Sequence, residues 1–225
     1  MESLNNDNQF KEEKQGDLRV FVSKSIKVVS VPNFLPVNER DALYKAVCVE
    51  QDEFKNYNPL LPDIKATRFL DLSSDKVNKV KTSLTQKAYK KLSKSIIKQL
   101  PSLLEALNIK SFTTSDIQLT FVNCPDGHYG NPHSDSTNGL YDISILYYFN
   151  SVPKVFLGGD LEVFDGKNSS SNPDTEPVFT IDFEDNLLLA FASETVHGVT
   201  KVQSSSTKFE DNRFIAVGFL SSKKE

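Results

Sequence analysis

Cysteine, histidine and long apolar runs are all scarce in this chain of 225 residues. Its two cysteines, Cys48 and Cys124, are too few for a disulfide framework, and they do not form a CxxC metal or redox pair. No apolar stretch approaches the length of a membrane span, and the polar first residues lack the basic start and apolar core of a signal peptide. We therefore expect a cytoplasmic protein that works in a reducing compartment.

A strong charge of either sign is also absent, because the formal net charge is −4 at pH 7. Lysines recur through residues 76–98, and such a run would suit a nucleic-acid-binding helix. Tyr89 is the only aromatic residue among them, however, so a solvated helix face is the better interpretation. We predict neither a nucleic-acid partner nor a membrane partner.

Apolar residues make up 38% of the chain, and sixteen phenylalanines and seven tyrosines indicate a folded globule with a sizeable core. Residues 1–15 are mostly polar and charged, and we predict a mobile tail there. Residues 16–225 are predicted to form a single domain. Strands and supporting helices are expected over 16–110, and the core of the fold over 111–225.

Two helical regions are expected in the first part of this domain. Asn38 is a candidate cap for a short helix that follows the proline-bracketed turn 32–36. Apolar residues at helical spacing predict a longer helix over 74–100. A separate helix is expected over 101–107, because Pro101 suits the first turn of a helix. Short strands are predicted at 18–22, 26–31 and 67–72, with a loop over 51–62.

The second part of the domain is dominated by short apolar segments without intervening helices. The predicted strands are 117–122, 143–149, 160–164, 178–183, 187–191 and 213–220. Repeated short strands of this kind indicate a sandwich or a jelly roll. The fold class predicted from the whole chain is therefore mainly β, with helices confined to the first part (α+β).

Three histidines occur in the whole chain, and two of them stand in positions that suit a metal ion. His133 and Asp135 lie two residues apart, so on an extended strand both side chains point the same way. His197 follows the apolar segment 187–191, where a β fold can bring it back to the first two. Two imidazoles and one carboxylate on one face of an octahedron suit non-haem Fe(II). A His-x-Asp tripeptide alone is also common in surface turns.

The chain resembles the Fe(II)- and 2-oxoglutarate-dependent oxygenases, and within them the prolyl 4-hydroxylase-like branch. The residues that carry the resemblance are, in order, His133-Ser134-Asp135, the segment 145–150, Gly158-Gly159-Asp160-Leu161, His197-Gly198-Val199 and Asn212-Arg213-Phe214. The likeness is close over about the last half of the chain. It implies a double-stranded β-helix (jelly roll) braced by N-terminal helices, with the jelly-roll core at 111–225.

The resemblance also implies roles for particular residues. His133, Asp135 and His197 would bind iron, and Arg213 would pair with the far carboxylate of 2-oxoglutarate. Tyr148 would donate a second hydrogen bond to that carboxylate. Buried dicarboxylates need such a partner, because an unpaired buried carboxylate costs several kcal/mol, and arginine can bind a carboxylate through two parallel hydrogen bonds.

Two departures from the resembling family leave alternatives open. Arg213 lies farther from His197 than the basic residue usually does, so Lys208 is an alternative anchor. Cys124 stands about where several relatives carry a tyrosine, which leaves contacts to the near end of 2-oxoglutarate unassigned. His128 is interpreted as a loop residue rather than a fourth ligand, and Tyr129 as a candidate substrate contact.

The function implied by the resemblance is hydroxylation of a C–H bond with release of succinate and CO2. The cofactors would be Fe(II), 2-oxoglutarate as cosubstrate, and O2, with ascorbate as a further candidate. The substrate would be a prolyl residue of a peptide or protein, or else a free amino acid or another small molecule. A non-enzymatic metal-binding or sensing protein on the same fold, and an interaction domain with a coincidental triad, remain the alternatives.

Overall fold

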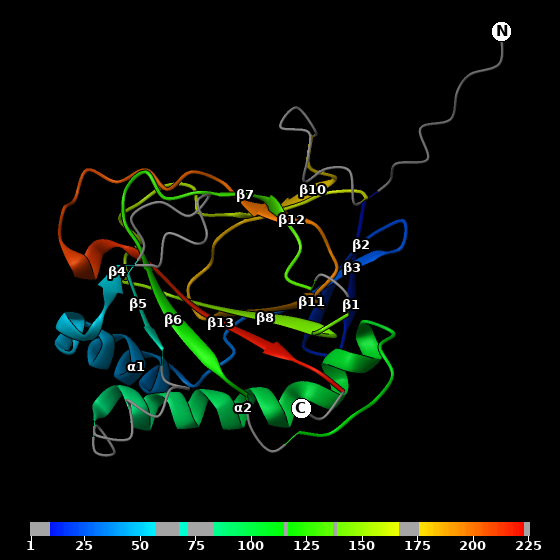
Figure 1. The fold of residues 1–225 in the computed structure, drawn as a ribbon, viewed down its shortest axis with the longest axis horizontal. Coiled ribbons are helices and arrows are strands. Elements are labelled where there is room, and N and C mark those ends of the chain that lie inside the picture. The colour runs from blue at the N-terminus through cyan, green and yellow to red at the C-terminus, as the bar shows by residue number, and fades with distance from the viewer. Residues whose placement is uncertain are drawn as a thin grey trace, which may run out of the picture.

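The computed structural model describes six stretches of the chain. These are residues 10–56, 68–71, 83–114, 117–136, 139–166 and 176–222. In these stretches two antiparallel sheets lie face to face, and helices cover the outer face of the larger sheet (Figure 1).

The larger sheet contains nine strands of the described residues. In spatial order they are β1 (Lys11–Gln15), β2 (Leu18–Ser23), β3 (Ile26–Val31), β11 (Leu187–Ala192), β8 (Ile143–Phe149), β13 (Arg213–Leu220), β6 (Leu119–Cys124), β5 (Arg68–Asp71) and β4 (Lys55–Asn56). Strand β8 is central, and all seven of its residues are buried. Such a strand packs against other elements on both faces, which explains its continuous apolar run.

The smaller sheet contains four described strands. In spatial order they are β10 (Phe179–Ile181), β9 (Leu161–Val163), β12 (His197–Val199) and β7 (Gly130–His133). Apolar side chains from both sheets, such as Leu146, Leu161 and Phe191, form one buried cluster between them. This arrangement is the double-stranded β-helix, which confirms the predicted fold class.

Two long helices pack on the far face of the larger sheet. They are α1 (Val37–Val49) and α2 (Leu84–Ala106), and short 3-10 turns occur at Gln51–Glu53 and Phe209–Asp211. Leu92 and Ile96 of α2 are fully buried in a second apolar cluster with Tyr147 and Phe149 of β8. The described lysines of α2 lie on its exposed side, as expected for a solvated face. No helix in the described stretches is long and apolar enough to cross a membrane.

The structure corrects the expected N-terminal boundaries. The predicted tail included residues 11–15, but Lys11–Gln15 forms strand β1 and pairs with β2. Residues 1–9 lie outside the described stretches. Helix α1 begins one residue before Asn38, and the carbonyl of Pro36 accepts the first amide hydrogen bonds in place of a side-chain cap.

The prediction of a separate helix at Pro101 is wrong. Helix α2 continues through this proline to Ala106. Pro101 is exposed, whereas Leu100, Leu103 and Leu104 are buried against the sheet. Their packing outweighs the hydrogen bond that proline removes from the helix interior. The predicted helix start at residues 74–75 lies outside the described stretches, and Ser83 caps the helix as described.

Most predicted strands of the second part are present, and two further short strands, β7 and β12, lie outside the six predicted ranges. Strand β7 ends at His133, so the extended strand expected to carry both His133 and Asp135 stops before Asp135, and β12 begins at His197 itself. The predicted loop at 51–62 contains a 3-10 turn and strand β4 in its described part. Both β7 and β12 are only three or four residues long, too short for a clear alternating pattern.

Candidate functional site

His133, Asp135 and His197 lie together between the two sheets. His133 and His197 face each other as register partners in β7 and β12, with ring centroids 4.5 Å apart. The Nε2 atom of His133 lies 3.6 Å from Asp135 Oδ1, and the Nε2 atom of His197 lies 3.6 Å from Asp135 Oδ2. One ligand atom from each residue lies within 4.8 Å of the others, so the three can hold one metal ion.

Both histidines point the same nitrogen toward Asp135. The Nδ1 atom of His133 lies 2.8 Å from the carbonyl oxygen of Asn131, and that of His197 lies 3.0 Å from the carbonyl of Thr195. A carbonyl only accepts, so each Nδ1 donates its hydrogen and each neutral ring keeps the Nε2 lone pair. This backbone contact fixes both rings in the tautomer that a metal ion requires.

Asp135 lies just beyond strand β7, which ends at His133. Its position is fixed by the backbone, because the amides of Asp135 and Ser136 both donate to the carbonyl of Ser193 at 3.0 Å. Its carboxylate accepts a hydrogen bond from the hydroxyl of Ser144 at 2.7 Å, and that hydroxyl also contacts Ser193 Oγ at 2.9 Å. Contacts to β8 and to the turn after β11 therefore hold the carboxylate.

The charges at this centre suit metal binding. Burial raises the pKa of Asp135, but its contacts with His133, His197 and Ser144 outweigh that effect and lower the pKa overall. Burial lowers the pKa of His197, despite the opposing attraction of Asp135. The preferred state is thus an ionised carboxylate beside a neutral imidazole, which are the forms that bind a cation.

Arg213 and Tyr148 form a second polar group in the same interior. Arg213 is 1% exposed and Tyr148 is 0% exposed. Among the described residues, neither Arg213 Nη2 nor the Tyr148 hydroxyl has a hydrogen-bond partner. Buried polar groups are nearly always paired, so two unpaired groups together indicate a site for a polar ligand. A carboxylate would pair with both donors.

The remaining contacts of Arg213 hold the side chain in place. Its Nε donates to the carbonyl of Gly159 at 2.8 Å, and its guanidinium carbon lies 5.0 Å from the ring centre of Tyr148 and 5.2 Å from that of Phe183. A Cβ atom at position 159 would lie 2.5 Å from Arg213 Cδ. Only glycine leaves room for the arginine here, and its φ of +78° also favours glycine.

Strand β8 joins the two polar groups. Ser144 and Tyr148 lie on the same face of this strand, four residues apart, which corresponds to about 13 Å of extended chain. Ser144 contacts Asp135 at one end, and Tyr148 lies under Arg213 at the other. By contrast, Lys208 is exposed beside the 3-10 turn that precedes β13.

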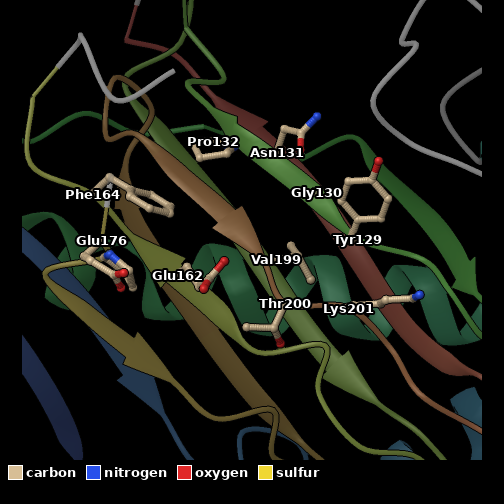
Figure 2. Close-up of a pocket in the computed structure, with 11 residues that line it drawn as sticks. Tyr129, Gly130, Asn131, Pro132, Glu162, Phe164, Glu176, Val199, Thr200 and Lys201 are labelled. Atoms are coloured by element: carbon tan, nitrogen blue, oxygen red, sulfur yellow. The ribbon is translucent and has the colours of Figure 1, made fainter. Parts of the chain in front are cut away.

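A shallow pocket of about 730 Å³ lies beside the strand that carries His133. Figure 2 shows Tyr129 and Lys201 on one side of this pocket and Phe164 and Glu176 on the other. Asn131 and Pro132, which line the pocket, directly precede His133 in β7.

Residues 118–221 match the model of the 2OG-Fe(II) oxygenase superfamily. This segment, a little under half of the chain, is similar to 2OG-Fe(II) oxygenase domains. Fe(II), 2-oxoglutarate and O2 are the cofactors of this superfamily. The ligand atoms of His133, Asp135 and His197 fit Fe(II). The unpaired donors of Arg213 and Tyr148 fit a carboxylate of 2-oxoglutarate. His133, Asp135, His197, Tyr148 and Arg213 all lie inside the matched segment.

Individual relatives agree with this family. The chain is 26% identical over 197 residues to an uncharacterized PKHD-type hydroxylase of Synechocystis sp., covering 86% of this chain and 62% of that relative. The chain thus spans less than two thirds of the length of this relative.

Solved structures share the fold at low sequence identity. A prolyl hydroxylase from Trichoplax adhaerens in complex with a hypoxia inducible factor peptide fragment matches with a TM-score of 0.61 and 17% identity, over 86% of this chain and 83% of that one. A prolyl-4-hydroxylase of Pseudomonas putida matches with a TM-score of 0.58 and 17% identity, over 88% of this chain and 93% of that one.

The sequence indicates the five candidate site residues but not the groups that hold them. Ser144 is one of the few hydroxyl residues in an apolar strand, and its spacing from Tyr148 was its signal. Ser193 and the two backbone carbonyls gave no signal, because their role depends on how loops from distant segments meet.

Proposed function

We propose that this protein is an Fe(II)- and 2-oxoglutarate-dependent dioxygenase that hydroxylates a C–H bond and releases succinate and CO2. One observation carries this proposal above all. The ligand atoms of His133, Asp135 and His197 lie within 4.8 Å of one another, with His133 exposed, and the buried interior next to them holds the unpaired donors of Arg213 and Tyr148.

The three proposed ligands differ in what they contribute. Nε2 of His133 and of His197 would bind the ion as neutral donors, and the carboxylate of Asp135 would supply one negative charge. Fe(II) held by these three residues would supply the oxidative chemistry at this centre. Ser144 and the carbonyl of Ser193 keep Asp135 in place throughout.

Arg213 and Tyr148 would bind the far carboxylate of 2-oxoglutarate. The permanent charge of Arg213 would balance that carboxylate in a buried site, and the Tyr148 hydroxyl would donate the second hydrogen bond. Burial raises the pKa of Tyr148 above the ordinary value of a tyrosine, so the hydroxyl stays protonated and can donate a hydrogen bond. The exposure of Lys208 supports Arg213 as the anchor.

The preferred substrate class is a prolyl residue of a peptide or protein. Its support is the likeness in fold to prolyl hydroxylases, one of them bound to a peptide fragment. A free amino acid or other small molecule is the second candidate.

The cellular setting follows from simpler features. Cys48 and Cys124 are unpaired, which supports a reducing compartment and hence the cytoplasm. The net charge of −4 supports a partner that is neither nucleic acid nor an anionic membrane.

Succinate formation tests the proposal. Purified protein with Fe(II), 2-oxoglutarate and O2 is expected to release succinate slowly without substrate and faster with a proline-containing peptide library. His133→Ala and Asp135→Ala should lose at least 90% of this release, because each removes a metal ligand, whereas Asp182→Ala changes an exposed carboxylate and should not. Metal binding without succinate would favour the sensing protein. Absence of stoichiometric metal binding would favour the interaction domain.

A further inference from the structure

Cys124 occupies an unusual position beside the proposed cosubstrate anchor. It is the last residue of β6, it is 0% exposed, and it pairs in register with Arg213 of β13. Arg213 donates a hydrogen bond from Nη1 to Cys124 Sγ at 3.4 Å. The thiol is therefore part of the surroundings of the guanidinium and not a separate buried side chain.

The three nitrogens of Arg213 have three different situations. Nε is bonded to the carbonyl of Gly159, Nη1 to the sulfur of Cys124, and Nη2 has no partner among the described residues. Only Nη2 is thus free for an incoming ligand. The charge of the guanidinium, however, is shared between that ligand and any negative charge on the sulfur.

A second buried residue acts on the same thiol. His128 is 6% exposed, and its backbone holds it in a tight turn through bonds to Pro125 and Val202. Its Nδ1 atom has no hydrogen-bond partner among the described residues. Burial raises the pKa of Cys124, but His128 and then Arg213 outweigh this and lower it to about 7.

We propose that Cys124 is a positioning residue for 2-oxoglutarate, whose neutral thiol permits binding and whose thiolate competes with the cosubstrate carboxylate for the charge of Arg213. This inference rests on the proposed function, since it assigns a further residue to the same cosubstrate site. The unpaired Nη2 of Arg213 and hydroxyl of Tyr148, both buried, mark the ligand position independently of the cysteine.

The direction of the pH effect follows from these contacts. The groups that face the thiol in the described residues are His128 after β6, Arg213 on β13 and Tyr148 on β8. Raising the pH converts the thiol to a thiolate, which binds the guanidinium as a counter-ion. The 2-oxoglutarate dianion then meets a neutralised anchor and a nearby negative charge, so binding weakens as the pH rises through about 7.

The test is the dissociation constant of 2-oxoglutarate for the Fe(II) protein, measured without oxygen by the metal-to-ligand charge-transfer band between pH 6.5 and 8.5. If only the thiol form binds, linkage predicts that the constant rises roughly 25-fold over this range. Cys124→Ser should give a flat profile, because a serine hydroxyl does not ionise there. Cys48→Ser is the matched control and should keep the slope, since Cys48 lies on α1.

A third variant separates this role from a merely structural one. His128→Asn should move the midpoint of the profile to higher pH, because it removes the strongest influence that lowers the thiol pKa. Circular dichroism checks folding, and Cys124→Ala replaces the serine variant if that one does not fold. A flat profile in the natural protein, or an unchanged slope in Cys124→Ser and Cys124→Ala, overturns the inference. Absence of 2-oxoglutarate binding at every pH overturns the proposed function instead.

Discussion

Ser144 illustrates how a single hydroxyl can determine metal affinity. It donates to Asp135 Oδ2 at 2.7 Å, so the carboxylate cannot rotate freely. Ser144→Ala should weaken Mn(II) binding about tenfold, as loss of a bond to a metal ligand generally does. Calorimetric titration measures this. Ser30→Ala is the control, because Ser30 is equally buried and its hydroxyl has no partner among the described residues. Equal Mn(II) affinity in the two variants would contradict the assigned role.

Gly159 offers a test of the cosubstrate anchor that leaves the metal ligands untouched. A methyl group at this position would lie 2.5 Å from Arg213 Cδ and 2.7 Å from Nε, so the arginine must move. Gly159→Ala should weaken 2-oxoglutarate binding at least tenfold while Mn(II) affinity stays the same. Gly166→Ala carries a similar backbone strain at a φ of +88° with no atom within 4 Å. Equal 2-oxoglutarate affinity in Gly159→Ala and Gly166→Ala would contradict the role of Arg213 as the anchor.

Strands and helices differed in how well the sequence predicted them. The central strands β8, β11 and β13 are continuous apolar runs with both faces covered, and such runs are clear in a sequence. Strand β1 was missed because its residues are all exposed and polar, and it pairs only with β2. The continuation of α2 through Pro101 depends on packing against the sheet, which local preference does not contain.

The grouping of the three candidate ligands was predictable from the sequence, whereas their geometry was not. The spacing of His133 and Asp135 indicated a shared ion, but the reason given was an extended strand, and the strand ends at His133. Asp135 instead reaches the site through the Ser193 carbonyl, a contact between distant segments. The orientation of both imidazoles likewise depends on backbone carbonyls, which every residue carries and no motif marks.

Helix α2 contributes to stability through its apolar side and not through its lysines. Leu92 is 0% exposed in the cluster beneath the larger sheet. Leu92→Ala should lower the free energy of unfolding by about 2–4 kcal/mol, because it removes buried methyl groups and leaves a cavity. Lys94→Ala on the exposed side should change it by less than about 0.5 kcal/mol. Urea unfolding measures the free energy of unfolding of both variants. Similar losses of stability in Leu92→Ala and Lys94→Ala would show that α2 does not pack as described.

The protein as a unit is expected to be more stable with metal bound, because the ligands come from both β7 and β12 and from the turn beyond β7. At a Mn(II) concentration 100 times the dissociation constant, the added stability is about 2.7 kcal/mol. The melting temperature should rise with Mn(II), fall back with a chelator, and not respond to Mn(II) in Asp135→Ala. An equal response in Asp135→Ala would place the metal elsewhere.

Iron, cosubstrate and anchor can be tested together in one titration. Adding 2-oxoglutarate to the Fe(II) protein without oxygen should produce the metal-to-ligand charge-transfer band in the natural protein and in Lys208→Ala. In Arg213→Ala the band should require at least tenfold more 2-oxoglutarate, because the buried carboxylate loses its counter-charge. A band that never forms although Fe(II) is bound, or one weakened in Lys208→Ala and not in Arg213→Ala, would contradict the proposed site.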